Sequence, residues 1–252
     1  MDDLKQLTQP EHLQPWDKQI RLFAGYFLAH VQLPTNKPFK LLDVGCGTGS
    51  AMAAIRKQYP LGDLEGCDIL DYVAEIAASM NSSAGRFFAS DIMSLREEYD
   101  CIYVSNVLEH IPDWRECLGH LCTLAPQVVV MVPYREDLSL QTSSGLERVD
   151  HVASFDDDSL SSFEQSGFRV ERRVIRTPFA WGGPRRRELV FRCRAALRGT
   201  RYVDRREILY LISRRELVDK EAATSRVRFR NRLLAFLHTL PVHRRVSAEV
   251  GI

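Results

Sequence analysis

Apolar residues are grouped in blocks along the middle of the chain. Between Lys40 and Pro133 a short apolar run is followed by a turn, then by a stretch of helical periodicity, then by another apolar run. This order predicts parallel strands joined by crossover helices. The runs are almost continuously apolar, as strands covered on both faces require. The expected strands are 41–45, 64–68, 86–90, 101–106 and 128–132, and the runs 168–177 and 207–215 would add a sixth and a seventh.

Helices are expected before the first strand and between the strands. The predicted ranges are 16–31, 50–59, 73–80, 113–124 and 156–166. The last range opens with the acidic run 156–158, which suits a helix N-terminus, and is closed by Gly167. The apolar face of the first helix is expected to carry Ile20, Phe23, Phe27 and Val31. The sequence therefore predicts an α/β fold, a doubly wound, mostly parallel, seven-stranded sheet with helices on both faces.

Length and composition are those of an enzyme-sized globular chain. The 252 residues allow one large domain or one domain with an appendage, and 45% hydrophobic residues suit a packed core. The six cysteines include no CxxC pair, so we expect buried thiols and a reducing, cytoplasmic compartment. The N-terminus is acidic and no window has the roughly 18 consecutive apolar residues of a membrane span, so neither secretion nor membrane insertion is expected.

A glycine-rich turn follows the first predicted strand. Gly45, Gly47 and Gly49 have no Cβ, which permits unusual backbone dihedrals and close approach by a ligand. The dinucleotide-binding pattern G-x-G-x-x-G is not matched, because position 50 is Ser. Asp43, two residues before the first glycine, would be poorly placed beside a phosphate but well placed for an ammonium group. The turn therefore favours a cationic ligand that carries an amino acid group.

The turn and its flanks resemble the first motif of the class I S-adenosylmethionine-dependent methyltransferases, apolar-apolar-acid-apolar-Gly-x-Gly-x-Gly. The resemblance covers residues 38–177 and extends to 207–215. It implies a Rossmann-like methyltransferase fold, S-adenosyl-L-methionine as the cofactor and S-adenosyl-L-homocysteine as the product.

By this resemblance the ends of three further strands also bind the cofactor. Asp68 stands where the family places the carboxylate that accepts hydrogen bonds from both ribose hydroxyls. Asp91 stands where the family has an acid that contacts the adenine. Asn106 lies in the segment that resembles the one under the methionine end of the cofactor. Taken alone, acids such as Asp68 and Asp91 are more often helix caps or solvated strand ends than ligands. The implied cofactor-binding residues are Asp43, Gly45, Cys46, Gly47, Gly49, Asp68, Ile69, Asp91, Ile92 and Asn106. Trp16, in the leading helix, either covers the cofactor or packs in the core.

The catalytic requirements of such a site are few. The sulfonium methyl is already activated, so the protein must align a nucleophile with it, and a hydroxyl acceptor also needs a base. His151 and His110 are the candidate bases, although His151 could instead bond its own loop and His110 could cap the following helix. Glu109 is expected to be structural. Tyr134 and Arg135, just after the fifth strand, are the candidate acceptor contacts.

No metal site is predicted from the sequence. His151 and the acidic run 156–158 could be drawn as ligands, but three consecutive acids at a helix start cannot all face one ion. The expected role of the acidic run is to complement the helix dipole.

The net charge of +1 is a cancellation. Residues 1–168 carry 12 Lys and Arg against 25 Asp and Glu, a balance of −13, whereas residues 169–252 carry 22 against 8, a balance of +14. The basic segment 226–245, if helical, is amphipathic. It would either lie on an anionic membrane or dock on a protein surface, that of this fold or of a second copy of the chain. Docking on a protein surface is favoured.

These features predict three regions. They are a helical cap at 1–37, a cofactor-binding methyltransferase domain at 38–216 with a basic helical insertion at about 182–203, and a basic amphipathic extension at 217–252. A cytoplasmic location is expected, with peripheral attachment to the inner face of the membrane as the variant in which 226–245 binds lipid.

The predicted activity is methyl transfer to oxygen or nitrogen of an anionic small-molecule or glycan-type acceptor. A lipid-linked or phosphorylated sugar of surface-polysaccharide biosynthesis is the narrower hypothesis. Methylation of RNA through the basic C-terminal region is one alternative. A non-catalytic binding module is another, against which the intact set of glycines and acids argues.

Overall fold

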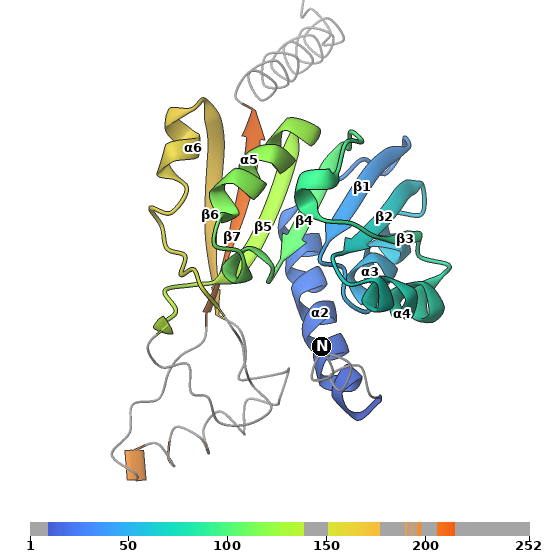
Figure 1. The fold of residues 1–252 in the computed structure, drawn as a ribbon, viewed down its shortest axis with the longest axis horizontal. Coiled ribbons are helices and arrows are strands. Elements are labelled where there is room, and N and C mark those ends of the chain that lie inside the picture. The colour runs from blue at the N-terminus through green and yellow to red at the C-terminus, as the bar shows by residue number, and fades with distance from the viewer. Residues whose placement is uncertain are drawn as a thin grey trace, which may run out of the picture. The chain divides into compact units, whose positions relative to one another are not determined.

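Seven strands form one sheet in the computed structural model of the chain (Figure 1). The structure describes residues 10–138, 151–176, 190, 193, 196–197 and 206–214. The strands are β1 (Phe39–Val44), β2 (Gly62–Asp68), β3 (Arg86–Ala89), β4 (Cys101–Ser105), β5 (Gln127–Pro133), β6 (Phe168–Arg176) and β7 (Arg206–Arg214). Their order in the sheet is β3-β2-β1-β4-β5-β7-β6. The first five strands are parallel, and β7 runs antiparallel to both β5 and β6. The predicted mostly parallel, seven-stranded sheet is confirmed, with strand ends within two residues of those expected.

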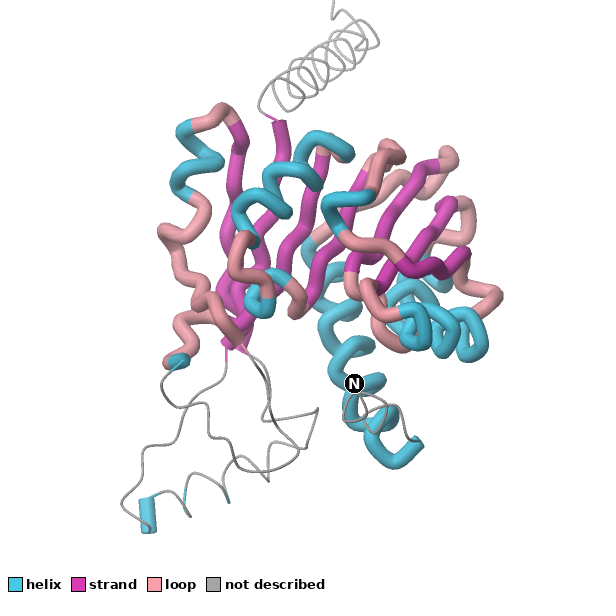
Figure 2. Tube along the Cα trace, in the orientation of Figure 1, coloured by secondary structure: helices cyan, strands magenta, loops and turns pink. Residues whose placement is uncertain are grey.

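The helices flank the sheet on both faces (Figures 1 and 2). They are α2 (Pro10–His30), α3 (Ser50–Gln58), α4 (Asp71–Asn81), α5 (Trp114–Leu124) and α6 (Ser161–Gln165), with single 3₁₀ turns η1 (Ile92–Ser94) and η2 (Leu108–His110). Since successive strand side chains point to opposite faces, the sheet supplies two apolar layers. Leu42 and Val44 pack in the layer with α5, whereas Leu41 packs in the layer with α2 and α3.

The leading helix α2 packs where its sequence pattern predicts. Phe23, Phe27 and Val31 are buried, and Ile20 is partly buried against them. The ring of Phe27 lies 4.6 Å, centroid to centroid, from that of Tyr103 on β4. These contacts fix the helix against the centre of the sheet.

The predicted start of the helix at 156–166 is wrong. The Asp156 carboxylate accepts from the backbone N–H of Asp158 at 3.0 Å and from the hydroxyl of Ser159 at 2.8 Å, so these residues form a turn closed by side chains. The α-helix begins only at Ser161. The acidic run therefore does not sit in the helix's first turn.

Several sequence predictions lie outside the described residues. They include the extension 217–252, the amphipathic segment 226–245 and most of the insertion 182–203, of which only residues 190, 193, 196 and 197 are described, as exposed helical positions. Five of the six cysteines are buried as predicted, and Cys193 is exposed. Within the described part of the chain, no helix has the length and apolar character needed to cross a membrane.

The α5 face of the sheet should dominate stability. Leu118 is fully buried there, so Leu118→Ala should lower the free energy of unfolding by about 2–5 kcal/mol through lost burial and a residual cavity. Leu61→Ala, the same truncation at a side chain that is 52% exposed, should cost less than about 0.5 kcal/mol. Guanidinium denaturation of both variants measures the difference. Equal destabilisation by the two would contradict this packing.

Candidate functional site

The turn from β1 into α3 requires its glycines. Gly45 and Gly49 have φ of 69° and 75°, in the left-handed region that disfavours a Cβ. A Cβ at Gly45 would collide with Val107, and one at Gly49 would lie 2.6 Å from the ring of Phe87. The turn is closed by a 2.9 Å hydrogen bond from Gly49 N–H to the Cys46 carbonyl. The backbone of the turn therefore lies against Val107, just after β4, and against Phe87 of β3, where a larger residue could not fit.

Two acidic side chains lie beside this turn at the ends of neighbouring strands. Asp43, at the end of β1, is buried, and its Oδ2 has no hydrogen-bond partner among the described residues. Burial, with the nearby charge of Asp68, raises the pKa of Asp43 to about 8. Asp68, at the end of β2, accepts from Gly47 N–H at 3.3 Å and from Leu70 N–H at 3.2 Å. Burial raises the pKa of Asp68 as well, although those backbone donors oppose the shift.

The next two predicted positions differ in exposure. Asp91 follows β3, and its carboxylate accepts from Met93 N–H at 2.7 Å as the cap of η1. Ile92 packs in the core, whereas Ile69 and Met93 are 67% and 38% exposed. The apolar surface at this end of β2 and β3 thus comes from Ile69 and Met93, the second of which the sequence pattern did not single out.

At the end of β4 the chain turns through a non-glycine residue in the left-handed region. Asn106 has φ of 52°, and its backbone N–H donates to the Met131 carbonyl at 2.8 Å. Its side-chain amide donates to Oε1 of Glu109 at 3.0 Å. Among the described residues Arg135, at the end of β5, is the other non-glycine residue with positive φ, at 50°. Strain of this kind is concentrated at functional sites, which directs attention to the ends of β4 and β5.

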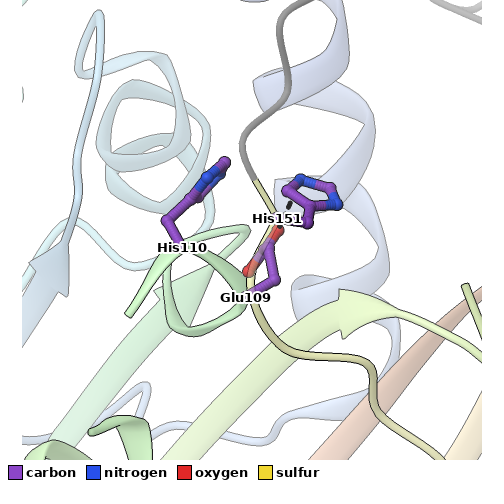
Figure 3. Close-up of side chains that lie close together, drawn as sticks. All are labelled: Glu109, His110 and His151. Carbon is purple, nitrogen blue, oxygen red and sulfur yellow. Dashed lines mark ion pairs between the residues drawn. The ribbon is translucent and has the colours of Figure 1, made fainter. Parts of the chain in front are cut away.

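Glu109, His110 and His151 form a cluster at this edge of the sheet (Figure 3). Nε2 of His151 lies 3.8 Å from Oε1 of Glu109, and the rings of the two histidines meet edge to face with centroids 4.7 Å apart. Glu109 is fully buried, His151 half-buried and His110 exposed. Burial raises the pKa of Glu109 to about 7, and its Oε2 has no hydrogen-bond partner among the described residues.

Backbone hydrogen bonds bring His151 to this position from about 40 residues further along the chain. The Glu109 carbonyl accepts from Val152 N–H at 2.7 Å and from Ala153 N–H at 3.1 Å. The Phe155 carbonyl accepts from Arg135 N–H at 2.7 Å. Residues 151–155 thus span the ends of β4 and β5. His151 Nδ1 also contacts the carboxylate of Glu136, a partner that sequence reasoning missed.

Tyr134 and Arg135 converge on one acid. The Tyr134 hydroxyl donates to Oδ2 of Asp157 at 2.5 Å, and the Arg135 guanidinium donates to the same oxygen at 2.9 Å. The Tyr134 hydrogen bond is the chief cause that lowers the pKa of Asp157, and the Arg135 charge adds to it. Arg135 is 64% exposed, so its remaining donors face solvent. The acidic run predicted to complement a helix dipole therefore holds these two side chains instead.

The leading helix reaches the glycine turn through a residue that sequence reasoning also missed. Trp16 lies in α2, and its side chain is outside the described atoms. The next residue, Asp17, accepts from Thr48 Oγ1 at 3.2 Å and contacts the Ser50 hydroxyl at the start of α3. The signal that could have identified this contact is the pair of hydroxyls at Thr48 and Ser50, within and just after the glycine turn. These two donors would suit an acid on a neighbouring helix.

Two comparisons with known sequences agree with this arrangement. A family model described as a methyltransferase domain matches residues 16–172, more than half of the chain. Trans-aconitate 2-methyltransferase of Enterobacter sp. strain 638 is 34% identical over 103 residues, which are 40% of this chain and 40% of that protein. Ribosomal RNA small subunit methyltransferase C of Vibrio vulnificus is 45% identical over 58 residues, 22% of this chain and 17% of that protein. The chain thus spans less than half the length of the curated relatives it matches.

The fold has a counterpart among solved structures. Magnesium protoporphyrin IX methyltransferase from Synechocystis PCC 6803, crystallised with S-adenosylhomocysteine, superimposes with a TM-score of 0.54 at 16% identity. The superposition covers 79% of this chain and 84% of that chain. At this identity the likeness is one of fold.

The buried acid at the end of β1 should make stability depend on pH. Because the pKa of Asp43 is about 8 in the folded protein and near 3.8 in the unfolded chain, unfolding releases a proton between these values, so the free energy of unfolding should fall as pH rises through this window. Asp43→Asn should make that slope shallower, since only Asp68 and Glu109 then contribute to it, whereas Asp63→Asn, at an exposed residue of β2, should leave the slope unchanged. Denaturation of the ligand-free protein at about pH 5 and about pH 8 tests this. Parallel pH profiles for the wild type and Asp43→Asn would contradict it.

Proposed function

The chain belongs to the class I S-adenosylmethionine-dependent methyltransferases, and on that premise we propose that it transfers the cofactor's methyl group to a small, negatively charged molecule that carries carboxylates. The observation that carries the cofactor half of this proposal is the pair of buried acids at the glycine turn. Two neighbouring carboxylates whose charged forms are destabilised by burial are suited to a ligand that supplies a cation and hydroxyl donors.

The cofactor is proposed to lie across the ends of β1 to β4. Asp43 would accept from the ammonium group and Asp68 from the ribose hydroxyls, with Gly45, Cys46, Gly47 and Gly49 forming the backbone wall. Ile69, Asp91 and Met93 would border the adenine, whereas Ile92, which the sequence also suggested, packs in the core. Asn106 would border the methionine end. In open α/β sheets ligands bind at the carboxyl ends of the strands, which supports this placement.

The acceptor is proposed to lie over the ends of β4 and β5. Arg135 offers exposed guanidinium donors there, and Arg presents a planar fork that matches a carboxylate. Trans-aconitate, in the name of the Enterobacter relative, is an acid of this class. A glycan or lipid-linked sugar finds no support among the relatives reported above, so the proposal is confined to small molecules.

A carboxylate acceptor makes the chemistry simple. One carboxylate oxygen attacks the methyl carbon, the carbon–sulfur bond breaks with its electron pair remaining on sulfur, and the products are a methyl ester and S-adenosylhomocysteine. No proton is transferred, so the protein's task is alignment of the two reactants. The base role expected of His151 or His110 is needed only for a hydroxyl or amine acceptor and stays a prediction.

Cofactor binding should depend on Asp68. Asp68→Asn removes the charge that strengthens the ribose hydrogen bonds and should weaken S-adenosylhomocysteine binding by roughly 10–100-fold. Asp63→Asn, on the exposed side of the same strand, should leave the affinity unchanged. Isothermal titration calorimetry of both variants makes the comparison. Absence of binding by the wild-type chain would overturn the proposed function.

Acceptor use should depend on Arg135. With radiolabelled cofactor and a panel of di- and tricarboxylic acids, the wild type should form a product that releases volatile methanol in alkali, as a methyl ester does. Arg135→Gln should raise KM for the acid about 10-fold or more and leave cofactor affinity intact, whereas Arg169→Gln, at an exposed residue of β6, should change neither.

The same assay tests whether RNA is the methyl acceptor, as the name of the ribosomal RNA methyltransferase suggests. If the methyl label that the enzyme transfers to cell extracts is stable in alkali and is lost after nuclease treatment, RNA and not a small molecule is the acceptor. A cofactor that binds but is never consumed with any acid or extract would favour a non-catalytic module.

A further inference from the structure

The cluster of Glu109, His110 and His151 is not used by methyl transfer to a carboxylate. It nevertheless gathers two imidazoles and a buried carboxylate at the end of β4, beside the proposed acceptor. Glu109 contributes from inside the protein, with one carboxylate oxygen unpartnered among the described residues. A fully buried acid without a partner on one oxygen is costly unless a ligand supplies one.

The spacing of the cluster is that of ligands around one ion. A candidate ligand atom from each residue lies within 4.8 Å of those from the other two. Atoms that bind one ion at about 2.0–2.2 Å lie roughly 3–4 Å apart. The 3.8 Å between His151 Nε2 and Glu109 Oε1 is in this range and is too long for a hydrogen bond. Ligand atoms that are up to 4.8 Å apart would have to approach one another by about 1 Å on binding.

The surroundings orient the ligands as at known metal sites. A histidine that binds a metal donates its other ring N–H to a carboxylate or carbonyl. His151 has this arrangement, because Nδ1 contacts the Glu136 carboxylate, which can only accept, and Nε2 then carries the lone pair on the Glu109 side. Asn106 likewise holds Oε1 of Glu109 by its amide at 3.0 Å. Glu136 and Asn106 thus already hold His151 and Glu109 in their orientations.

Charge points the same way. Glu109 and Glu136 approach a single imidazole from its two nitrogens, so two carboxylates share one histidine. A divalent cation would balance both. His110 is exposed, which gives an ion a route from solvent.

We propose that Glu109, His110 and His151 bind one divalent transition-metal ion of the zinc type, whose open positions take carboxylate oxygens of the acceptor. Two histidines and one carboxylate with an open position are the protein ligands of several catalytic zinc sites, and imidazole favours zinc and its neighbours over magnesium. The ion holds a carboxylate that is not methylated and so fixes the acceptor's orientation. This role for the ion rests on the proposed function, whereas the binding of the ion does not.

Cobalt(II) titration of the full chain tests the site, since zinc itself has no d-electron absorption. The wild type should take up one equivalent of Co²⁺ with d–d absorption that Zn²⁺ abolishes, and an added tricarboxylic acid should change the spectrum. His110→Ala with His151→Ala should lose that equivalent. Glu136→Gln should weaken Co²⁺ binding roughly 10–100-fold by releasing the orientation of His151. His30→Ala, at an exposed histidine ending α2, should behave as wild type.

Circular dichroism and S-adenosylhomocysteine calorimetry on the same samples separate the outcomes. A double variant that keeps its fold and its affinity for S-adenosylhomocysteine but loses the Co²⁺ spectrum supports the site. An unchanged spectrum in that variant, or no d–d absorption in the wild type, overturns it while leaving the methyltransferase proposal standing. Co²⁺ bound without any binding of S-adenosylhomocysteine would overturn the proposed function instead. If the double variant unfolds, the graded loss in Glu136→Gln relative to His30→Ala decides the question.

Discussion

Parallel pairing of β1 with β2 and β4, and of β4 with β5, is the constraint on which the candidate site depends. Parallel strands need crossover connections, so the carboxyl end of every such strand emerges at the same edge of the sheet. Asp43, Asp68 and Asn106 are far apart in the sequence, yet the register sets them at adjacent strand ends. The two buried apolar layers hold that register, because a slip of one residue would turn each layer's side chains to the opposite face.

Buried acids are the shared electrostatic feature of this edge. Asp43 and Glu109 have pKa values raised by burial to about 8 and about 7, and each has an oxygen without a partner among the described residues. Such groups lower the stability of the ligand-free protein when they ionise. The proposed ligands are correspondingly positive where they meet these acids, an ammonium group at Asp43 and a metal ion at Glu109. Burial of these acids thus lowers the stability of the ligand-free protein, and the proposed ligands would restore it.

Most of the sheet, and the glycine turn at which the cofactor is proposed to bind, could be predicted from the sequence, because both follow from local pattern. Apolar runs locate strands, and the spacing of the turn glycines is a property of ten consecutive residues. Glu136 and the role of Asp157 could not be predicted, since they depend on residues 151–157 returning across the ends of β4 and β5. The predicted helix start at 156 was wrong because the Asp156 side chain closes a local turn with Asp158 and Ser159. Asp156 accepts from Ser159, and Asp157 accepts from Tyr134 and Arg135. A prediction based on the helix dipole does not take such side-chain contacts into account.

The chemistry of the acceptor decides what the two histidines can do. A hydroxyl or amine acceptor must lose a proton, and a nitrogen lone pair near the reacting atom then acts as a base. A carboxylate has no proton to lose, so the same lone pairs can only orient the acceptor, directly or through an ion. His151 fits the second case better, because its Nε2 faces a buried carboxylate that would compete for any proton taken up. The proposed anionic acceptor and the proposed metal-holding cluster are therefore mutually consistent, and together they would make positioning, not proton transfer, the protein's main contribution to the reaction.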